Sequence, residues 1–387
     1  MDNKERIVKL LSALISIPSY VSESTNENAI ADYITSYIKS LGFLDLEKQQ
    51  VIDGRYNIVA SDGSKPKLAF VCHMDTVPAS TDWDTDPLNA TVKDGFVYGL
   101  GACDMKGGIA SLLDALKDFK KTDGLLLVFD IDEEYYLRGM TKFADECNEA
   151  PELAILPEPG LAMRRGHRGV VEVKVEVKGV SAHAAKPSQG KSASLGMIRI
   201  ISNIENELRN YSDEFLGNSV LNVASINAGL FEGRNAQGSA VLSEKANKIP
   251  DFAEALIEIR NAKDSLNASE LKQIVEKAAE SEGVQVIGFK TMLDRGTLNV
   301  DRKRLTVLEK AVEKSRGKLE YADPGTVGYG EGQILYAKTG TPCVYFGPGP
   351  NDRAHKANER VAVSELMEAR KIFSELIRMF CKDEKSK

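Results

Sequence analysis

The side chains in this sequence that could do chemistry are a small set of imidazoles and carboxylates. Of only four histidines in 387 residues, His73 stands in the stretch FVCHMDTVP, two residues before Asp75 and directly after the apolar run KLAFVC. Neutral imidazole and carboxylate together suit zinc, cobalt or manganese. A histidine beside an acid at the end of an apolar run therefore indicates a candidate metal ligand. The other candidates are Asp104, Asp132, Glu133, Glu134, Glu158 and His355.

This set contains more ligands than one tetrahedral ion needs. Two ions that share one bridging carboxylate would use the set fully, and paired ions can polarise a carbonyl and lower the pKa of a shared water. One further carboxylate that is not a ligand would then take the proton from that water. Glu133 and Glu134 are adjacent, so that one could bind metal while the other faces the substrate. Asp75 could accept a hydrogen bond from the ring of His73 and so fix its tautomer.

Most of these candidates lie just after a predicted strand, and Asp104 lies at a Gly-rich turn that leads into a helix. Strands and helices alternate, which predicts an α/β fold with a mostly parallel sheet and helices on both faces. In such sheets, ligands bind in the crevice beyond the carboxyl ends of the strands. The predicted strands cover 56–60, 67–72, 124–132, 152–156, 318–321 and 343–347, and the predicted helices cover 3–17, 27–41, 106–120, 138–148, 303–316 and 363–381.

Residues 169–292 have a different pattern. The stretch VVEVKVEVKG alternates apolar and charged residues, which is typical of a strand in an antiparallel sheet with one solvated face. Helices are predicted at 192–209 and 268–281, between further strand-like runs. These features predict a smaller α+β domain over 169–292, inserted into a catalytic metal-binding domain that is made of residues 1–168 and 293–387.

The composition limits the class of protein and its partners. The net charge is −7 and no tract is strongly basic, which argues against nucleic acid as a partner. Residues 1–20 form an amphipathic pattern, and no run reaches the roughly 18–20 apolar residues of a membrane-spanning helix, so neither a secretory signal nor a membrane partner is expected. Five cysteines without a C-x-x-C pair are typical of reduced thiols, which predicts a cytoplasmic location.

Several short motifs occur in order along nearly the whole chain: HMDTVP, YGLGACDMKGG, DEE, PEP and FGPGPNDRAHKANE. In order and spacing they resemble the metal-dependent aminoacylase and carboxypeptidase family, which includes acetylornithine deacetylase, succinyl-diaminopimelate desuccinylase and the glutamate carboxypeptidases. The resemblance is greatest to the acetylornithine deacetylase branch. It implies a hydrolase fold of the di-zinc type with an inserted dimerisation or lid domain. It also implies two divalent metal ions per chain, zinc first and cobalt second, and a homodimer formed through the inserted domain.

The resemblance further implies a ligand role for five of the candidates. His73, Asp104 and Glu158 would hold one ion. Asp104, Glu134 and His355 would hold the second ion, so that Asp104 would bridge the two. A site of this kind would hydrolyse linear amide bonds.

Catalytic residues follow from the same resemblance. Glu133 would be the general base, and Asp75 would be the partner that orients His73. In the inserted domain, GVSAHAAKPSQG matches the segment whose histidine, here His183, stabilises the oxyanion, and in family members it does so from the partner subunit. The expected reaction is removal of the acyl group from an N-acyl amino acid of the acetylornithine type.

Substrate contacts are implied by two more segments. NKIPDFAEALIEIR matches the segment whose Asn and Arg, here Asn247 and Arg260, meet the substrate's carboxylate, for which a charge-assisted arginine contact is well suited. Gly325 lies in a loop that lines the substrate pocket in the family, but here the loop reads GTVGYGEG in place of a Gly-Thr-Ser-Asp-like sequence. His167 is either a hinge or surface residue or a substrate contact.

Other functions remain open. The substrate could be a dipeptide or short peptide, as for a dipeptidase or carboxypeptidase, or a succinylated diamino acid, as for the desuccinylase. An inactive metal-binding scaffold on the same fold is a further alternative, although neither a ligand nor the general base is missing. A nucleotide-binding enzyme is the last alternative, but GLGACDMKGG lacks the G-x-x-x-x-G-K-[ST] spacing of a phosphate-binding loop.

Overall fold

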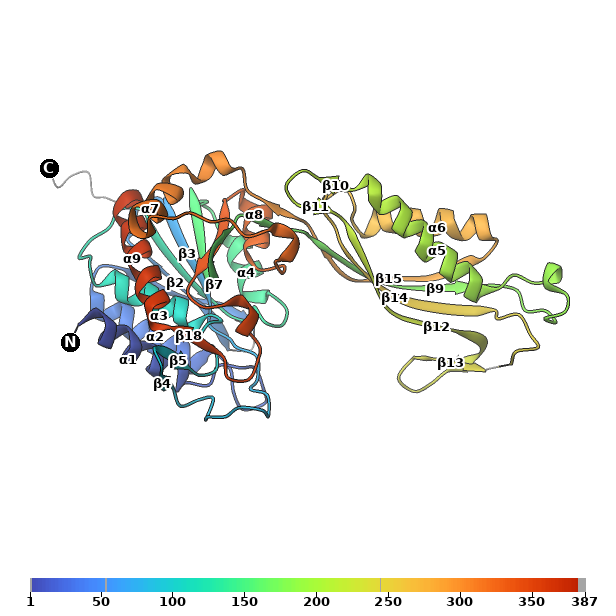
Figure 1. The fold of residues 1–387 in the computed structure, drawn as a ribbon, viewed down its shortest axis with the longest axis horizontal. Helices are drawn as coiled ribbons and strands as arrows, with labels where there is room; N and C mark the ends of the chain where they lie inside the picture. Colours follow the sequence, from blue (N-terminus) through green and yellow to red (C-terminus); the bar gives the residue numbers. More distant parts are fainter. Residues whose placement is uncertain (1, 53, 244, 382–387) are drawn as a thin grey trace. The chain divides into compact units, whose positions relative to one another are not determined.

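The computed structural model describes residues 2–52, 54–243 and 245–381, which form two compact units (Figure 1). The larger unit comprises Met1–Arg165, Val300–Asp323 and Gly330–Lys387, and the inserted unit comprises Gly166–Asn299 and Pro324–Tyr329. The domain predicted over 169–292 falls inside the longer segment of the inserted unit. None of the helices in the described ranges is both long and apolar enough to cross a lipid bilayer.

A six-stranded sheet forms the centre of the larger unit, with the strand order β1-β2-β6-β3-β7-β17. Strands β6, β3, β7 and β17 run parallel to one another. At one edge of the sheet, β2 runs antiparallel to β6, and β1 runs antiparallel to β2. Every residue of β3, β6 and β17 is buried, as expected for continuous apolar strands that are covered on both faces. The strands are β1 Asp45–Ile52, β2 Arg55–Ser61, β3 Leu68–His73, β6 Leu125–Asp130, β7 Leu153–Arg164 and β17 Cys343–Gly347.

Helices lie on both sides of this sheet (Figure 1). Helices α1, α3, α7 and α9 pack against one another, and α4 packs against α8 in a second group. The helices are α1 Asn3–Ile15, α2 Asn28–Leu41, α3 Lys106–Leu116, α4 Arg138–Glu146, α7 Thr306–Arg316, α8 Gly332–Thr339 and α9 Val363–Phe380. A small three-stranded sheet adds β4 Thr91–Lys93, β5 Phe96–Tyr98 and β18 Arg360–Ala362.

The α/β class predicted from the sequence is confirmed, and most predicted helices and strands lie within a few residues of the observed ones. The sequence pattern does not predict β1, nor α8, which directly follows the Gly-rich loop. The predicted strand at 318–321 is wrong. Of its residues, only Tyr321 forms a bridge, an isolated one with Met163.

Strand β7 departs from the prediction at Pro157. A proline cannot donate a ladder hydrogen bond, so the sequence predicts that the strand ends there. The strand instead continues to Arg164 through an irregular stretch in which Tyr345 of β17 faces both Leu156 and Arg164. This irregularity accommodates the proline, and it places Glu158 within the strand rather than after it.

The inserted unit contains a five-stranded antiparallel sheet, with the strand order β13-β12-β14-β9-β15, and two helices. The alternation predicted from VVEVKVEVKG is confirmed on β9, where Val171, Val173, Val175 and Val177 are buried in a core shared with both helices. The elements are β9 Val170–Lys178, α5 Ala193–Glu207, β12 Val220–Arg234, β13 Ala240–Ser243, β14 Phe252–Arg260, α6 Ala268–Glu282 and β15 Gln285–Arg295.

Two short strands, β8 (Gly166–His167) and β16 (Leu298–Asn299), pair where the chain enters and leaves the inserted unit. His167 is buried, and its ring lies 5.4 Å from the ring of Tyr329. His167 is therefore a residue of this connecting segment and not a surface histidine.

Candidate metal centre

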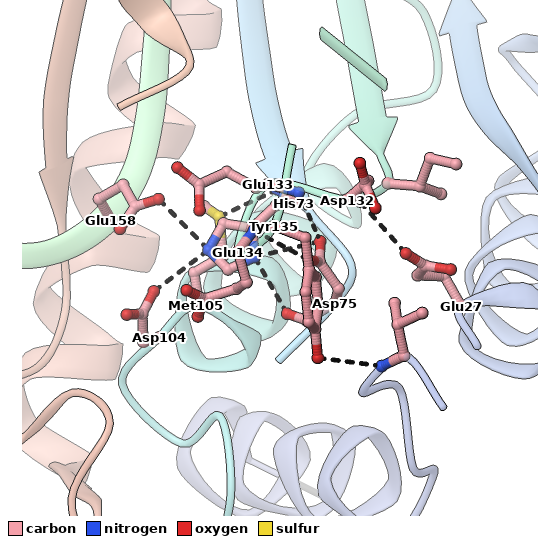
Figure 2. Close-up of polar contacts among 12 residues, drawn as sticks. Glu27, His73, Asp75, Asp104, Met105, Asp132, Glu133, Glu134, Tyr135 and Glu158 are labelled. Carbon is pink, nitrogen blue, oxygen red and sulfur yellow. Dashed lines mark hydrogen bonds and ion pairs between the residues drawn. The ribbon is translucent and has the colours of Figure 1, made fainter. Parts of the chain in front are cut away.

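His73 is the last residue of β3 and lies at the carboxyl end of the parallel strands. Its side chain is 1% exposed. The Nε2 atom lies 3.1 Å from Oδ1 of Asp104 and 3.3 Å from Oε1 of Glu158. Both carboxylates point toward the ring, one from the loop before α3 and the other from β7 (Figure 2). These three side chains form one group of potential metal ligands.

A second group overlaps the first. His355 lies in the loop between β17 and β18, and its Nε2 is 2.9 Å from Oε1 of Glu134 and 3.3 Å from Oδ2 of Asp104. In each group the potential ligand atoms lie within 4.8 Å of one another. The structure thus brings five predicted ligands together as two groups that share Asp104. Their role as metal ligands stays a prediction.

The site contains more negative than positive charge. In the part of the chain that the structure describes, no lysine or arginine forms an ion pair with Asp104, Glu134 or Glu158. Burial opposes protonation of His73, but its hydrogen bonds to Asp104 and Glu158 raise its pKa well above the usual value. Hydrogen bonds to Asp104 and Glu134 raise the pKa of His355 to about 10. Divalent cations would replace these protons and neutralise the carboxylates, so the donor set fits metal ions.

A turn directly after β6 contains Glu133 and Glu134. The carboxylate of Asp75 accepts hydrogen bonds from the backbone N–H of Glu133, at 3.1 Å, and of Glu134, at 3.0 Å (Figure 2). Asp75 also approaches His73, whose Nδ1 lies 3.0 Å from the Asp75 backbone carbonyl but 3.8 Å from its carboxylate Oδ1. The ring is therefore held most closely by the backbone of Asp75, while the buried carboxylate anchors the turn, which the sequence does not predict.

Glu133 is partly buried, and its carboxylate has no hydrogen-bond or ion-pair partner among the described residues. Burial raises the pKa of Glu133 well above its usual value, and the nearby carboxylates of Glu158 and Glu134 raise it further. Bound cations would lower this pKa again. Glu133 therefore lies beside both ligand groups with a free carboxylate, and its role as the general base stays a prediction.

The loop that contains Asp104 is held by a residue that sequence reasoning missed. Glu359 is buried, and its carboxylate accepts hydrogen bonds from the backbone N–H of three loop residues. These residues are Gly101 at 2.9 Å, Cys103 at 2.8 Å and Asp104 at 3.0 Å. The only signal for Glu359 in the sequence is its place as the last residue of the motif FGPGPNDRAHKANE.

The remaining predicted site residues belong to the inserted unit. His183 is exposed and lies beside Asn247, because the carbonyl of Asn247 accepts a hydrogen bond from the N–H of Ala184 at 2.9 Å. Arg260 is the last residue of β14 and donates to Glu258 at 2.9 Å. The structure thus brings His183 and Asn247 together and places Arg260 at the far end of a strand.

Gly325 lies on the short helical turn Pro324–Thr326, which packs beside β8 in the inserted unit. It is exposed. Among the residues predicted to contact substrate, it is therefore placed near the connecting segment rather than near His183.

Two groups of potential metal ligands at the carboxyl edge of a mostly parallel sheet form a candidate site of the kind that metal-dependent hydrolases use. The comparison with known proteins agrees. The chain belongs to peptidase family M20/M25/M40, whose sequence model matches residues 69–379. The family predicted from the short motifs is confirmed, and the chain is a hydrolytic enzyme.

The relatives of this chain within the family are named for different substrates. The chain is 29% identical over 394 residues to an acetylornithine deacetylase of Photorhabdus laumondii, covering 97% of each chain. It is 26% identical to a succinyl-diaminopimelate desuccinylase of Sulfurimonas denitrificans, covering 96% of this chain and 99% of the relative. The fold is similar to that of the Bacillus subtilis protein YXEP, a dinuclear metal-binding peptidase of the M20 family, with a TM-score of 0.67, 16% identity and 97% of each chain covered.

Proposed function

We propose that this chain is a di-metal amide hydrolase that removes the acyl group from an N-acyl amino acid of the acetylornithine type. The observation that supports this proposal most strongly is the pair of ligand groups that share Asp104, with the unpartnered carboxylate of Glu133 beside them. The acetylornithine deacetylases among its relatives support the choice of substrate class.

The five clustered side chains would hold two divalent ions, zinc first and cobalt second. His73, Asp104 and Glu158 would bind one ion, and Asp104, Glu134 and His355 would bind the other. Imidazole and carboxylate donors suit both metals. When bound, paired ions of this kind polarise a substrate carbonyl and lower the pKa of water. The dinuclear site named for the similar B. subtilis protein supports this assignment.

Glu133 would move the proton in this reaction. It takes the proton from the attacking water and later delivers it to the nitrogen of the leaving amine, so the carboxylate returns to its starting state. Its position beside the ligand groups suits this role, because burial raises the pKa of Glu133, so it holds a proton more readily than an exposed carboxylate does. Asp75 holds the backbone N–H of Glu133 and thereby fixes where the carboxylate points.

The inserted unit would serve as a dimerisation or lid domain, and a homodimer through it has support in the unit itself. Strand β12 pairs with β14 along Val220–Gly229, but β13 covers its other edge only along Leu230–Arg234. Within the described ranges, no other strand pairs with that edge. Exposed apolar side chains lie on the same unit, at Ile226 of β12 and at Leu195 and Ile198 of α5. A free strand edge with apolar neighbours suits pairing with a second copy of the chain.

In such a dimer, His183 would stabilise the oxyanion from the partner subunit. We expect His183→Ala to lower kcat by about 10²–10³-fold, which is the typical loss when one oxyanion donor is removed. Metal content should stay at the wild-type value, because His183 belongs to neither ligand group. Steady-state kinetics and elemental analysis of the same sample check both points. Ser188→Ala, an exposed neighbour, is the control and should leave kcat unchanged. Loss of metal from His183→Ala would contradict the assignment.

Substrate binding would involve Asn247 and Arg260, which suit a carboxylate, and Gly325 of the loop beside the connecting segment. A desuccinylase activity is a second candidate, since relatives with that name are 26% identical over nearly the full chain. A dipeptidase or carboxypeptidase activity is the third. Hydrolysis of N-acetyl, N-succinyl and dipeptide substrates, measured with zinc and with cobalt, distinguishes them. Preference for an N-acetyl amino acid is the expected result, and no hydrolysis of any of them would favour an inactive scaffold.

A further inference from the structure

A network of two buried acids, the buried Arg55 and the partly exposed Arg138 lies behind the turn that contains Glu133 and Glu134. Glu27 and Asp132 are fully buried, at 0% exposure. Arg55 binds both oxygens of Glu27, through Nε at 2.8 Å and Nη2 at 2.5 Å, and its Nη2 also lies 3.2 Å from Oδ1 of Asp132. Arg138 binds both oxygens of Asp132, at 2.6 and 2.8 Å. The network joins the segment before α2, strand β2 and the start of α4 to a single residue, Asp132.

Asp132 is the residue at which the chain turns from β6 toward Glu133. Its φ of +69° lies in the left-handed region, which is unfavourable for a residue with a Cβ atom. Its backbone carbonyl accepts hydrogen bonds from the N–H groups of Tyr136, at 3.1 Å, and Leu137, at 2.7 Å. The conformation of Asp132 therefore sets the direction in which Glu133 leaves the strand.

The backbone N–H groups of three consecutive residues are held by two buried carboxylates. Glu27 accepts from Asp132 at 3.2 Å, and Asp75 accepts from Glu133 and Glu134 (Figure 2). Asp75 contacts His73, a member of the first ligand group, through its backbone carbonyl. Glu27 belongs to neither of the two ligand groups. Glu27 also lies before the segment matched by the family model, residues 69–379.

We propose that Glu27 is a positioning residue for the general base: together with Arg55 it fixes Asp132 in its left-handed conformation and so places the Glu133 carboxylate for proton transfer. This inference rests on the proposed function of Glu133. A buried ion pair alone is weak evidence for a special role, because such pairs often contribute little to stability. Here the carboxylate of Glu27 accepts a hydrogen bond from the backbone N–H of Asp132, the residue before the base. It also binds Arg55, which in turn contacts the side chain of Asp132. A displacement of about 1 Å at a catalytic group can cost about 10²-fold in rate.

The chain contains a matched control for the cost of disturbing buried charge. Asp114 is also fully buried and is bound by Arg370 at 2.9 Å and by Arg6 at 2.5 Å. This network joins α3, α9 and α1, and among the described residues none of its hydrogen bonds reaches the turn that contains Glu133. Asp114→Asn therefore reports the general effect of removing one buried negative charge from the larger unit.

The test compares Glu27→Gln with Asp114→Asn in the full-length, metal-loaded protein. For Glu27→Gln we expect kcat to fall about 10–100-fold, with KM within about twofold and metal content at the wild-type value. We also expect amide hydrogen exchange in the peptide 131–137 to accelerate, because the N–H of Asp132 loses its charged acceptor. Asp114→Asn should leave both kcat and this exchange rate near the wild-type values.

A Glu27→Gln variant with kcat within twofold of wild type, or with unchanged exchange at 131–137, overturns the inference. An equal loss of kcat in Asp114→Asn overturns it too, since the effect would then be a general one.

If Glu27→Gln does not fold, Arg55→Lys is the second variant. It keeps the positive charge but loses the two-point contact with Glu27, and it must show the same fall in kcat. Hydrogen exchange needs no substrate, so it tests the positioning of the turn even if the proposed amide substrates are not hydrolysed, a result that would count against the proposed function alone.

Discussion

Glu133→Gln should lower the turnover of an N-acyl amino acid by about 10²–10⁴-fold, the usual contribution of a general base, while the metal content stays unchanged. The amide of glutamine has nearly the shape of the carboxylate but cannot take a proton from water. The side chain of Glu133 has no described polar partner, and its backbone N–H stays bound to Asp75, so the substitution should not disturb the turn. Steady-state kinetics and elemental analysis on one preparation measure both quantities.

The neighbouring residue supplies a matched control. Glu134→Gln makes the same substitution in the same turn, but Glu134 lies 2.9 Å from His355 and belongs to the second ligand group. We therefore expect Glu134→Gln to lose metal as well as activity. Retained turnover in Glu133→Gln would refute its role as the base. Metal loss from Glu133→Gln equal to that from Glu134→Gln would show that the roles of the two neighbours have been confused.

Removal of metal is the second change with a large expected effect. Chelation should abolish turnover, and return of zinc or cobalt should restore it. Without cations, Asp104, Glu134 and Glu158 have only the two imidazoles as ion-pair partners among the described residues. Metal binding to the folded state also stabilises it, by about 2.7 kcal/mol when free metal is one hundred times its Kd. The metal-free chain should therefore unfold at a lower temperature, which thermal unfolding with and without zinc measures.

Protons should compete with this metal binding. The pKa of His355 is raised to about 10 by Asp104 and Glu134, so its ring holds a proton at neutral pH in the metal-free chain. Metal binds neutral imidazole, and loading therefore releases that proton. It follows that metal removal should become easier as the pH falls.

The strand-end positions of the site could be predicted because they depend on local patterns. Two strands are identified by apolar runs, one ending at His73 and the other just before Glu133. Because these strands pair in parallel, both ends lie at the same edge of the sheet. The change to an antiparallel sheet in the inserted unit is predicted for a similar reason, because the apolar and charged residues alternate along β9, which has one buried and one partly exposed face. These features need only residue type and spacing.

The features that could not be predicted depend on contacts between distant parts of the chain. Glu27 and Glu359 are acids in polar stretches, and nothing in their neighbours indicates burial. Their partners, the N–H groups of Asp132 and Asp104, lie more than one hundred residues away in the sequence. The carboxylate of Asp75 anchors the turn for the same kind of reason. The groups that react are visible in local residue patterns, whereas the groups that position them depend on contacts between distant parts of the chain.

We propose that this hydrolase works with two metal ions that share Asp104. The most direct test is a titration of the metal-free chain with zinc, in which bound metal and hydrolysis of an N-acetyl amino acid are measured at each addition. We expect binding to saturate at two ions per chain and full activity to be reached only at that point. Saturation at one ion, or full activity in a chain that binds none, would contradict the proposal.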